Sequence, residues 1–379
     1  MGNSIKGILL IDRGVPEDLN RESLIQYYQA NLKDNFYTSG PRWLQKFIIN
    51  YLIIPWNLNY WFTKYRRFWS SKGFIGRFEM NQSIDILQRL LSQSAPKNQW
   101  IVEIASLYGD KPIDSVLLRM KTSGVQELLI IPLFPQWSEA SRGILELKLK
   151  NLFTESWLKK STILPPFYEN SDVISAQSEL LMKSLPKHID ESVSIISAFR
   201  NEIIKTTSIN SLQVCRKCLT SDSECRPDLI TKGYCYRFQC YDSAKKINEK
   251  SELLYWDVAF YPTQAQARFN KNLNPSLKAV TDHLLEQGVT TMIVQCPSIV
   301  YSEIETINDI GVELREYFLD NGGLKFVLVP SLGRSIHWLS ILQKMILEQF
   351  DHNFSIPHNL NINADRQIGL DNYRFTVVQ

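Results

Sequence analysis

The residues best suited to chemistry stand after an apolar run in the last third of the chain. Residues 292–294 predict a buried strand, and Pro297 ends it. Glu305 and Asp309 follow, four residues apart, so on a helix their carboxylates share one face. In open α/β sheets, ligands bind at the carboxyl ends of the strands. Two carboxylates there suit the handling of protons or of a divalent cation, although a solvated helix face explains the spacing equally well.

A cluster of cysteines forms a second group of reactive side chains. Cys215, Cys218, Cys225 and Cys235 lie within twenty-one residues, and Cys240 follows them. Six cysteines in a chain of 379 residues do not make a disulfide scaffold. In a reducing compartment, this clustering indicates a metal or iron–sulfur site. Four thiolates suit zinc as well as a [2Fe–2S] cluster, and a segment without metal is the third alternative.

Length and composition describe an ordinary globular protein. The hydrophobic fraction is 44% and the charged fraction is 21%, and 379 residues predict two domains. A net charge of +3 is too small to indicate a nucleic-acid partner. The first residues lack the long apolar segment of a signal peptide, so we expect a cytoplasmic protein.

The elements that must position these residues alternate between short strands and helices. Strands are predicted at 7–12, 100–107, 126–133, 193–198, 253–258, 290–296 and 325–329. Residues 124–138 repeat the pattern that begins at 288, and GILLIDRG at 7–14 resembles SIISAF at 194–199. These repeats predict an α/β fold of two similar Rossmann-like lobes, whose parallel sheets face a central cleft.

The lobes are predicted to span residues 1–185 and 186–350, with a tail at 351–379. The second lobe contains a cysteine insertion at 205–240, and the first contains an aromatic, apolar segment at 43–69. That segment is too short and too interrupted to cross a bilayer. It fits an interfacial segment or the wall of an apolar cleft, and a core helix is an equal alternative.

Several motifs together resemble the ferrochelatases, the lyases that insert Fe²⁺ into a porphyrin in haem biosynthesis. They are GILLIDRGVPE, LYGDKPI, IIPLFPQWSEASRG, CPSIVYSEIETINDI and LGRSIHWL, spread between residues 7 and 339. The resemblance implies two lobes around a porphyrin cleft, Fe²⁺ as a substrate and porphyrin or haem as the partner. It also implies a membrane-facing lip, at the place of 43–69.

The resemblance also implies a set of site residues. Glu305 matches the active-site glutamate of the family and Asp309 the next acidic position, so both are expected to be catalytic. The positions expected to contact substrate are Asp12, Arg13, Trp137, Ser138, Phe199, Trp256 and Ser302. This chain departs from the family at three of the cleft walls. Phe199 stands where the family has a histidine, and the loops at Asp12–Arg13 and Trp256–Ala259 differ.

The cysteine insertion resembles a segment of certain bacterial ferrochelatases that hold a [2Fe–2S] cluster. Cys218, Cys225 and Cys235 match that layout, which leaves Cys215 or Cys240 as the fourth ligand. Two principal functions remain open. The chain is either a working chelatase or a catalytically silent paralogue that binds porphyrin, haem or a protein partner, because phenylalanine cannot accept a proton. A protein-interaction module that reuses the fold is a third.

Overall fold

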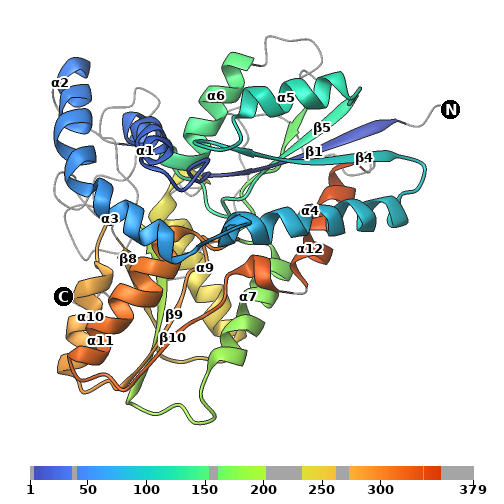
Figure 1. Cartoon of the computed structure of the whole chain (residues 1–379). Helices are drawn as coiled ribbons and strands as arrows, with labels where there is room; N and C mark the ends of the chain where they lie inside the picture. Colours follow the sequence, from blue (N-terminus) through green and yellow to red (C-terminus); the bar gives the residue numbers. More distant parts are fainter. Residues whose placement is uncertain are drawn as a thin grey trace.

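The structure is a computed structural model that describes residues 4–35, 41–152, 161–201, 233–261, 273–335 and 337–350. It contains two four-stranded parallel sheets, each covered by helices on both faces (Figure 1). Most of the cysteine insertion and the tail at 351–379 lie outside the described residues.

The first sheet has the strand order β4-β1-β5-β6. Its strands are β1 (Ile5–Asp12), β4 (Gln99–Ser106), β5 (Glu127–Pro132) and β6 (Thr162–Ile163). Alternate side chains of β1 enter two different cores, as a strand with both faces covered requires. One core lies against α4 (Ile75–Ser94) and α12 (Trp338–Phe350). The other lies against α1 (Arg21–Asn35), α5 (Ile113–Thr122) and α6 (Ile144–Leu152).

The second sheet has the strand order β10-β9-β7-β8. Its strands are β7 (Val193–Arg200), β8 (Asp257–Tyr261), β9 (Thr291–Gln295) and β10 (Lys325–Leu328). One face packs against α10 (Leu277–Glu286), η5 (Glu305–Leu314) and α11 (Arg315–Asp320). The other packs against α7 (Ser171–Ser184) and α9 (Tyr236–Lys250).

The two sheets have the same topology. When each set of strands is numbered from its own first strand, one sheet reads 2-1-3-4 and the other reads 4-3-1-2, which is the same order in reverse. In this correspondence β1 matches β7 and β5 matches β9, the two pairs of segments whose sequences resemble each other. The prediction of two α/β lobes with parallel sheets is confirmed.

The predicted strand at 253–258 is wrong, because β8 begins only at Asp257. Leu254 and Tyr255 are each 86% exposed, in the connection that follows α9. The strand instead continues to Tyr261, and its residues 258–261 are all buried between two layers of helices. An apolar run adjoining the true strand produced the error, since composition alone does not set where a strand begins.

Residues 42–67 form a continuous helical segment on the first lobe, at the upper left of Figure 1. It consists of α2 (Arg42–Phe47), the π-helical η1 (Ile48–Ile53) and α3 (Ile54–Arg67), and short strands β2 (Trp69–Ser70) and β3 (Gly73–Phe74) follow. Ile49, Ile53 and Trp61 pack against α1, where Trp61 stacks on Tyr28. Among the described residues, no helix combines the length and apolarity needed to cross a membrane.

Two helices near the boundaries of the predicted lobes, α7 and α12, pack against the sheet of the neighbouring lobe. α12 packs against α4 and joins the core of the first sheet, although it ends the second predicted lobe. α7 contributes Val173 to a core of the first sheet and Leu181 to a core of the second sheet. Boundaries at 185 and 350 therefore stay a prediction, and the two lobes share helices at their junction.

Candidate functional site

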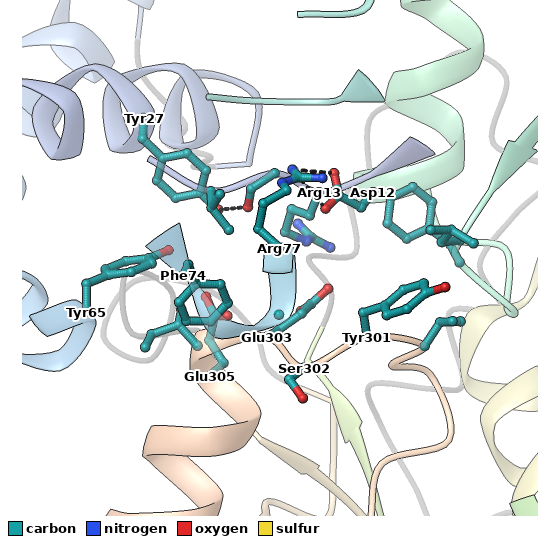
Figure 2. A pocket seen from close by; sticks show the side chains of 17 residues that line it. Asp12, Arg13, Tyr27, Tyr65, Phe74, Arg77, Tyr301, Ser302, Glu303 and Glu305 are labelled. Carbon is teal, nitrogen blue, oxygen red and sulfur yellow. Dashed lines mark hydrogen bonds and ion pairs between the residues drawn. The ribbon is translucent and has the colours of Figure 1, made fainter. Parts of the chain in front are cut away.

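A cavity lies between the lobes, at the carboxyl ends of their strands. Its volume is about 40 Å³, which is room for a few water molecules. The first lobe contributes the loop after β1 and the start of α4, and the second contributes the loop after β9. Figure 2 shows the polar lining, which includes Asp12, Arg13, Arg77, Ser302, Glu303 and Glu305.

Two carboxylates from the second lobe share one guanidinium. Arg200, the last residue of β7, contacts the carboxylate of Glu303 directly, and its Nη2 lies 3.3 Å from Oε2 of Glu305. Only 4% of Arg200 is exposed to solvent. The ion pairs are therefore shielded from water, where charge–charge interactions are strongest.

The surroundings push the pKa values of these two carboxylates in opposite directions. Burial raises the pKa of Glu303 and outweighs the opposing charge of Arg200. Burial also opposes ionisation of Glu305, but Arg200 and Lys64 more than compensate, so the pKa of Glu305 is lowered. A pair with separated pKa values can hold a proton on one member while the other stays ionised, which suits acid–base chemistry.

Asp12 and Arg13 form the facing wall on the first lobe. Asp12 is neutralised by Arg77, whose Nη2 lies 3.1 Å from its Oδ2, while the Nε of Arg77 lies 2.8 Å from Oδ2 of Asp110. Arg13 is 8% exposed, and its charge favours the ionised form of Glu303 across the cavity. The two walls thus bring a cation of one lobe towards the carboxylates of the other.

Gly76 permits the close approach of the lobes at Ser302. A Cβ atom at Gly76 would lie 1.9 Å from the carbonyl oxygen of Ser302, far inside van der Waals contact. The start of α4 therefore lies directly against the loop after β9. Ser302, one of the positions that the family resemblance implied, lines the cavity, and its backbone forms part of the contact between the lobes.

Asp309 shares a region with Glu305 but does not line the cavity. Its Oδ1 lies 2.5 Å from Nζ of Lys64, which is 4% exposed on α3. The hydroxyl of Tyr60 donates to Glu313, and Arg67 donates to Asn308, so α3 and η5 are joined at three points. The expectation that Glu305 and Asp309 lie on a helix is confirmed, and this part of the helix is π-helical. Asp309 connects the lobes in this structure.

The ionisation of Asp309 should affect how the free energy of unfolding depends on pH. Burial, opposed by Lys64, raises its pKa from the usual 3.8 to about 6. The folded protein therefore binds this proton more tightly than the unfolded chain, and this contribution is lost as the pH rises from about 4 to 6. We expect the free energy of unfolding to fall by up to about 3 kcal/mol over that window from this group.

Urea denaturation of wild type and Asp309→Asn at several pH values tests this expectation. The variant should lack the decrease between pH 4 and 6, while its unpaired Lys64 changes stability by a constant amount there. Asp114→Asn, on the exposed side of α5, serves as the control and should keep the wild-type slope. Parallel curves for wild type and Asp309→Asn would contradict the assignment.

The structure separates several other predicted site residues from the cavity. Phe199 is fully buried in a core with Cys240 and Phe260. Successive side chains of β7 point to opposite faces, so Arg200 points the other way, towards Glu303 and Glu305. Trp256 precedes β8 and so lies at the amino end of the sheet, opposite the cavity. Neither residue lines the cavity between the lobes, and their role in substrate binding stays a prediction.

Trp137 and Ser138 lie near the start of α9. The backbone N–H of Trp137 donates to Oε1 of Gln239 at 2.7 Å, and its ring meets Tyr234 edge-on at 5.0 Å. Ser138 is buried, with its hydroxyl 2.5 Å from that of Ser141. Neither residue belongs to the lining of the cavity between the lobes. They face the last residues of the cysteine insertion, and their role in binding stays a prediction.

Two cysteines of the insertion fall within the described residues. Cys240 is fully buried in the apolar core with Phe199 and Phe260. Cys235 precedes α9 and is 3% exposed. The described residues contain no group of three or more histidine, cysteine or acidic side chains that could hold a metal ion. Cys215, Cys218 and Cys225 lie outside the described part of the chain.

Sequence reasoning missed Arg200 and Glu303. The helical spacing of Glu305 and Asp309 drew attention to those positions, whereas Glu303 lies in the loop before the helix. The sequence did contain a signal, since SEIE places two glutamates after Pro297. Arg200 gave none, because a basic residue at the end of a strand is common on protein surfaces.

Comparison with known proteins shows similarity to ferrochelatases over almost the whole of the described chain. The family model described as ferrochelatase matches residues 5–350. The ferrochelatase of Bdellovibrio bacteriovorus is 27% identical over 345 residues, covering 88% of this chain and 96% of its own. One from Legionella pneumophila is 25% identical over 350 residues, covering 91% and 99%. The structure of SirB from Bacillus subtilis with Fe³⁺ has a TM-score of 0.50 at 10% identity, covering 92% of this chain and 97% of that one, and supports the fold.

Proposed function

The chain belongs to the ferrochelatase family, and from that premise we propose that it is a porphyrin metal chelatase that binds a tetrapyrrole between its lobes and inserts Fe²⁺. One observation carries this proposal. Glu303 and Glu305 are partly buried at the carboxyl edge of the second sheet and face Arg13 across the cavity between the lobes (Figure 2). A chelatase needs proton acceptors and cation ligands at one point, and partly buried carboxylates supply both.

The proposed chemistry follows from the charges of this site. Insertion of Fe²⁺ replaces the two pyrrole N–H protons, so two protons leave as the metal enters. Glu305, with its lowered pKa, is the group that accepts a proton or contacts the ion, and Glu303 holds a proton more readily. Arg13 is suited to pair with a carboxylate of the tetrapyrrole. The cavity as it stands is too small to enclose a whole tetrapyrrole.

A specific observation favours a second candidate, a silent paralogue that binds tetrapyrrole without inserting metal. Phe199, at the position of the family's histidine, is packed in the core and cannot transfer protons. Arg200 occupies both carboxylates. Under this alternative, porphyrin or haem binds between the lobes and leaves unchanged.

Absorbance spectra recorded without oxygen distinguish the two candidates. Porphyrin alone is added to the purified protein to report binding, and Fe²⁺ is then added to report insertion. Loss of the porphyrin spectrum and growth of the metalloporphyrin spectrum, faster than in buffer, supports the chelatase. Binding without that change supports the silent paralogue, and absence of binding rejects both.

We also propose that the segment 42–56 contacts the membrane surface, so that the protein works in the cytoplasm at a bilayer. Trp43, Tyr51 and Trp56 are 69%, 67% and 74% exposed, and Phe47 is 49% exposed. The basic residues Arg42 and Lys46 are exposed on the same helix. Aromatic side chains beside basic ones suit the interface of an anionic bilayer.

The double variant Trp43→Ala/Trp56→Ala should bind anionic vesicles about a hundredfold more weakly, because each exposed indole would bury apolar area in the interface. Co-sedimentation with vesicles of mixed zwitterionic and anionic lipid measures the change. Leu254→Ala/Tyr255→Ala is the matched control, since it removes two side chains of equal or greater exposure from another surface. Equal loss in both variants would reject the proposed contact.

For the cysteine insertion, we propose a [2Fe–2S] cluster held by Cys215, Cys218, Cys225 and Cys235, with zinc as the alternative. Cys240 is left out because its side chain packs in the apolar core. Such a cluster would supply electron-transfer or structural chemistry in the insertion, and the proposed insertion of Fe²⁺ does not pass through it. Iron, sulfide and zinc content should fall in Cys235→Ser and remain unchanged in Cys240→Ser. Loss in both variants, or in neither, would contradict this ligand set.

A further inference from the structure

Arg200 pairs with carboxylate oxygens that a metal ion would need as ligands. Its guanidinium contacts the carboxylate of Glu303 and lies 3.3 Å from Oε2 of Glu305. Both carboxylates therefore use an oxygen on the same internal cation. A divalent ion bound by the pair would compete for those oxygens and would sit beside a positive charge.

The backbone holds Arg200 firmly in this position. It is the last residue of β7, and its carbonyl accepts a hydrogen bond from the hydroxyl of Tyr236 at 3.0 Å. The next residue, Asn201, is fixed on both sides, since its N–H donates to Tyr261 and its side chain accepts from the N–H of Leu273. An arginine anchored in this way loses little further freedom when its side chain pairs with the carboxylates.

Other charges reinforce the effect. Arg13 and Lys64 lie close enough to favour the ionised form of Glu305. The carboxylates thus already have their countercharge without any bound ion. A free divalent ion would gain little there, because the desolvation of a metal ion must be offset by strong ligands.

We propose that Arg200 is a specificity-determining residue that occupies the cation position between Glu303 and Glu305 and excludes free divalent metal from the protein without tetrapyrrole. The inference rests on the proposed function only in naming this pair as the point of metal entry. It adds that Arg200 already neutralises the charge of the two carboxylates in the wild-type protein, and that removing the Arg200 side chain should create a metal site.

Binding of Mn²⁺ to the protein without tetrapyrrole, measured by electron paramagnetic resonance, tests the proposal. Wild type should show no tight binding. Arg200→Ala and Arg200→Gln should bind Mn²⁺ at least about a hundredfold more tightly, because they remove a positive charge a few ångströms from the ion. Adding Glu305→Gln to either variant should abolish the new site. The control Arg119→Ala removes an arginine from an exposed pair with Glu103 and should behave as wild type.

Chemical rescue separates occupancy from a purely structural role. Methylguanidinium added to Arg200→Ala should displace Mn²⁺, since it restores the missing cation, whereas methylammonium at equal concentration should displace less. If neither Arg200→Ala nor Arg200→Gln folds, Mn²⁺ binding to the wild-type protein alone tests the proposal. Tight Mn²⁺ binding to wild type that is lost in Glu305→Gln would overturn the proposal, as would unchanged binding in folded Arg200 variants.

These measurements are independent of the proposed function because they contain no tetrapyrrole. Failure of porphyrin to bind wild type would reject the chelatase and leave the Mn²⁺ result standing. Conversely, porphyrin binding with equal Mn²⁺ affinity in wild type and both variants would reject the role of Arg200 alone.

Discussion

Glu305→Gln should reduce the rate of Fe²⁺ insertion by about a hundredfold to a thousandfold, because it removes a positioned proton acceptor and cation ligand together. The substitution keeps the size and hydrogen-bonding capacity of the side chain. Arg200 retains Glu303 as its partner, so we expect the fold to survive. Anaerobic turnover with porphyrin and Fe²⁺ measures the loss, and porphyrin titration should show nearly unchanged affinity.

A matched variant on the same helical segment controls for charge alone. Glu316→Gln removes one carboxylate from the exposed side of α11 and should keep wild-type turnover. Glu303→Gln should also slow insertion, since the two carboxylates act on one point. Wild-type turnover in Glu305→Gln, with folding and porphyrin binding intact, would remove this residue from the reaction.

Phe199→His should destabilise the protein by about 3 kcal/mol without raising turnover, even though it restores the imidazole typical of the family. The side chain of Phe199 is fully buried against Phe260 and Cys240. An imidazole at that place would replace apolar contacts with buried polar atoms, and it would lie on the face of the sheet away from Glu303. Urea denaturation and anaerobic turnover together measure both effects.

Two comparison variants locate the cause. Phe199→Leu keeps an apolar side chain and should cost only about 1 kcal/mol. Arg200→His places an imidazole one residue later, on the face that meets the carboxylates, and should disturb the apolar core less. A stable Phe199→His variant with increased turnover would show that residue 199 reaches the reacting atoms, contrary to its packing here.

Much of the fold follows from local sequence. Apolar runs of strand length, interrupted by helical periods, predicted the alternation of elements in both lobes, because a parallel sheet covered on both faces requires continuous apolar strands. The similarity of 7–14 to 194–199, and of 124–138 to the segment from 288, predicted the duplication that the strand orders confirm. Glu305 was placed near the carboxyl end of a strand, and Asp12, Arg13 and Ser302 were implied by the family resemblance; all four line the cavity.

Which side chains form ion pairs at and near the site was decided only by the tertiary structure. The period of two along β7 states that residues 199 and 200 face opposite ways, but the packing of α9 decided that Phe199 enters the core and Arg200 meets Glu303 and Glu305. Likewise, Lys64 and Asp309 lie far apart in sequence and meet because α3 rests on η5. Local sterics set strands and helices, whereas these ion pairs depend on how elements far apart in the sequence pack together, and no short stretch of sequence contains that information.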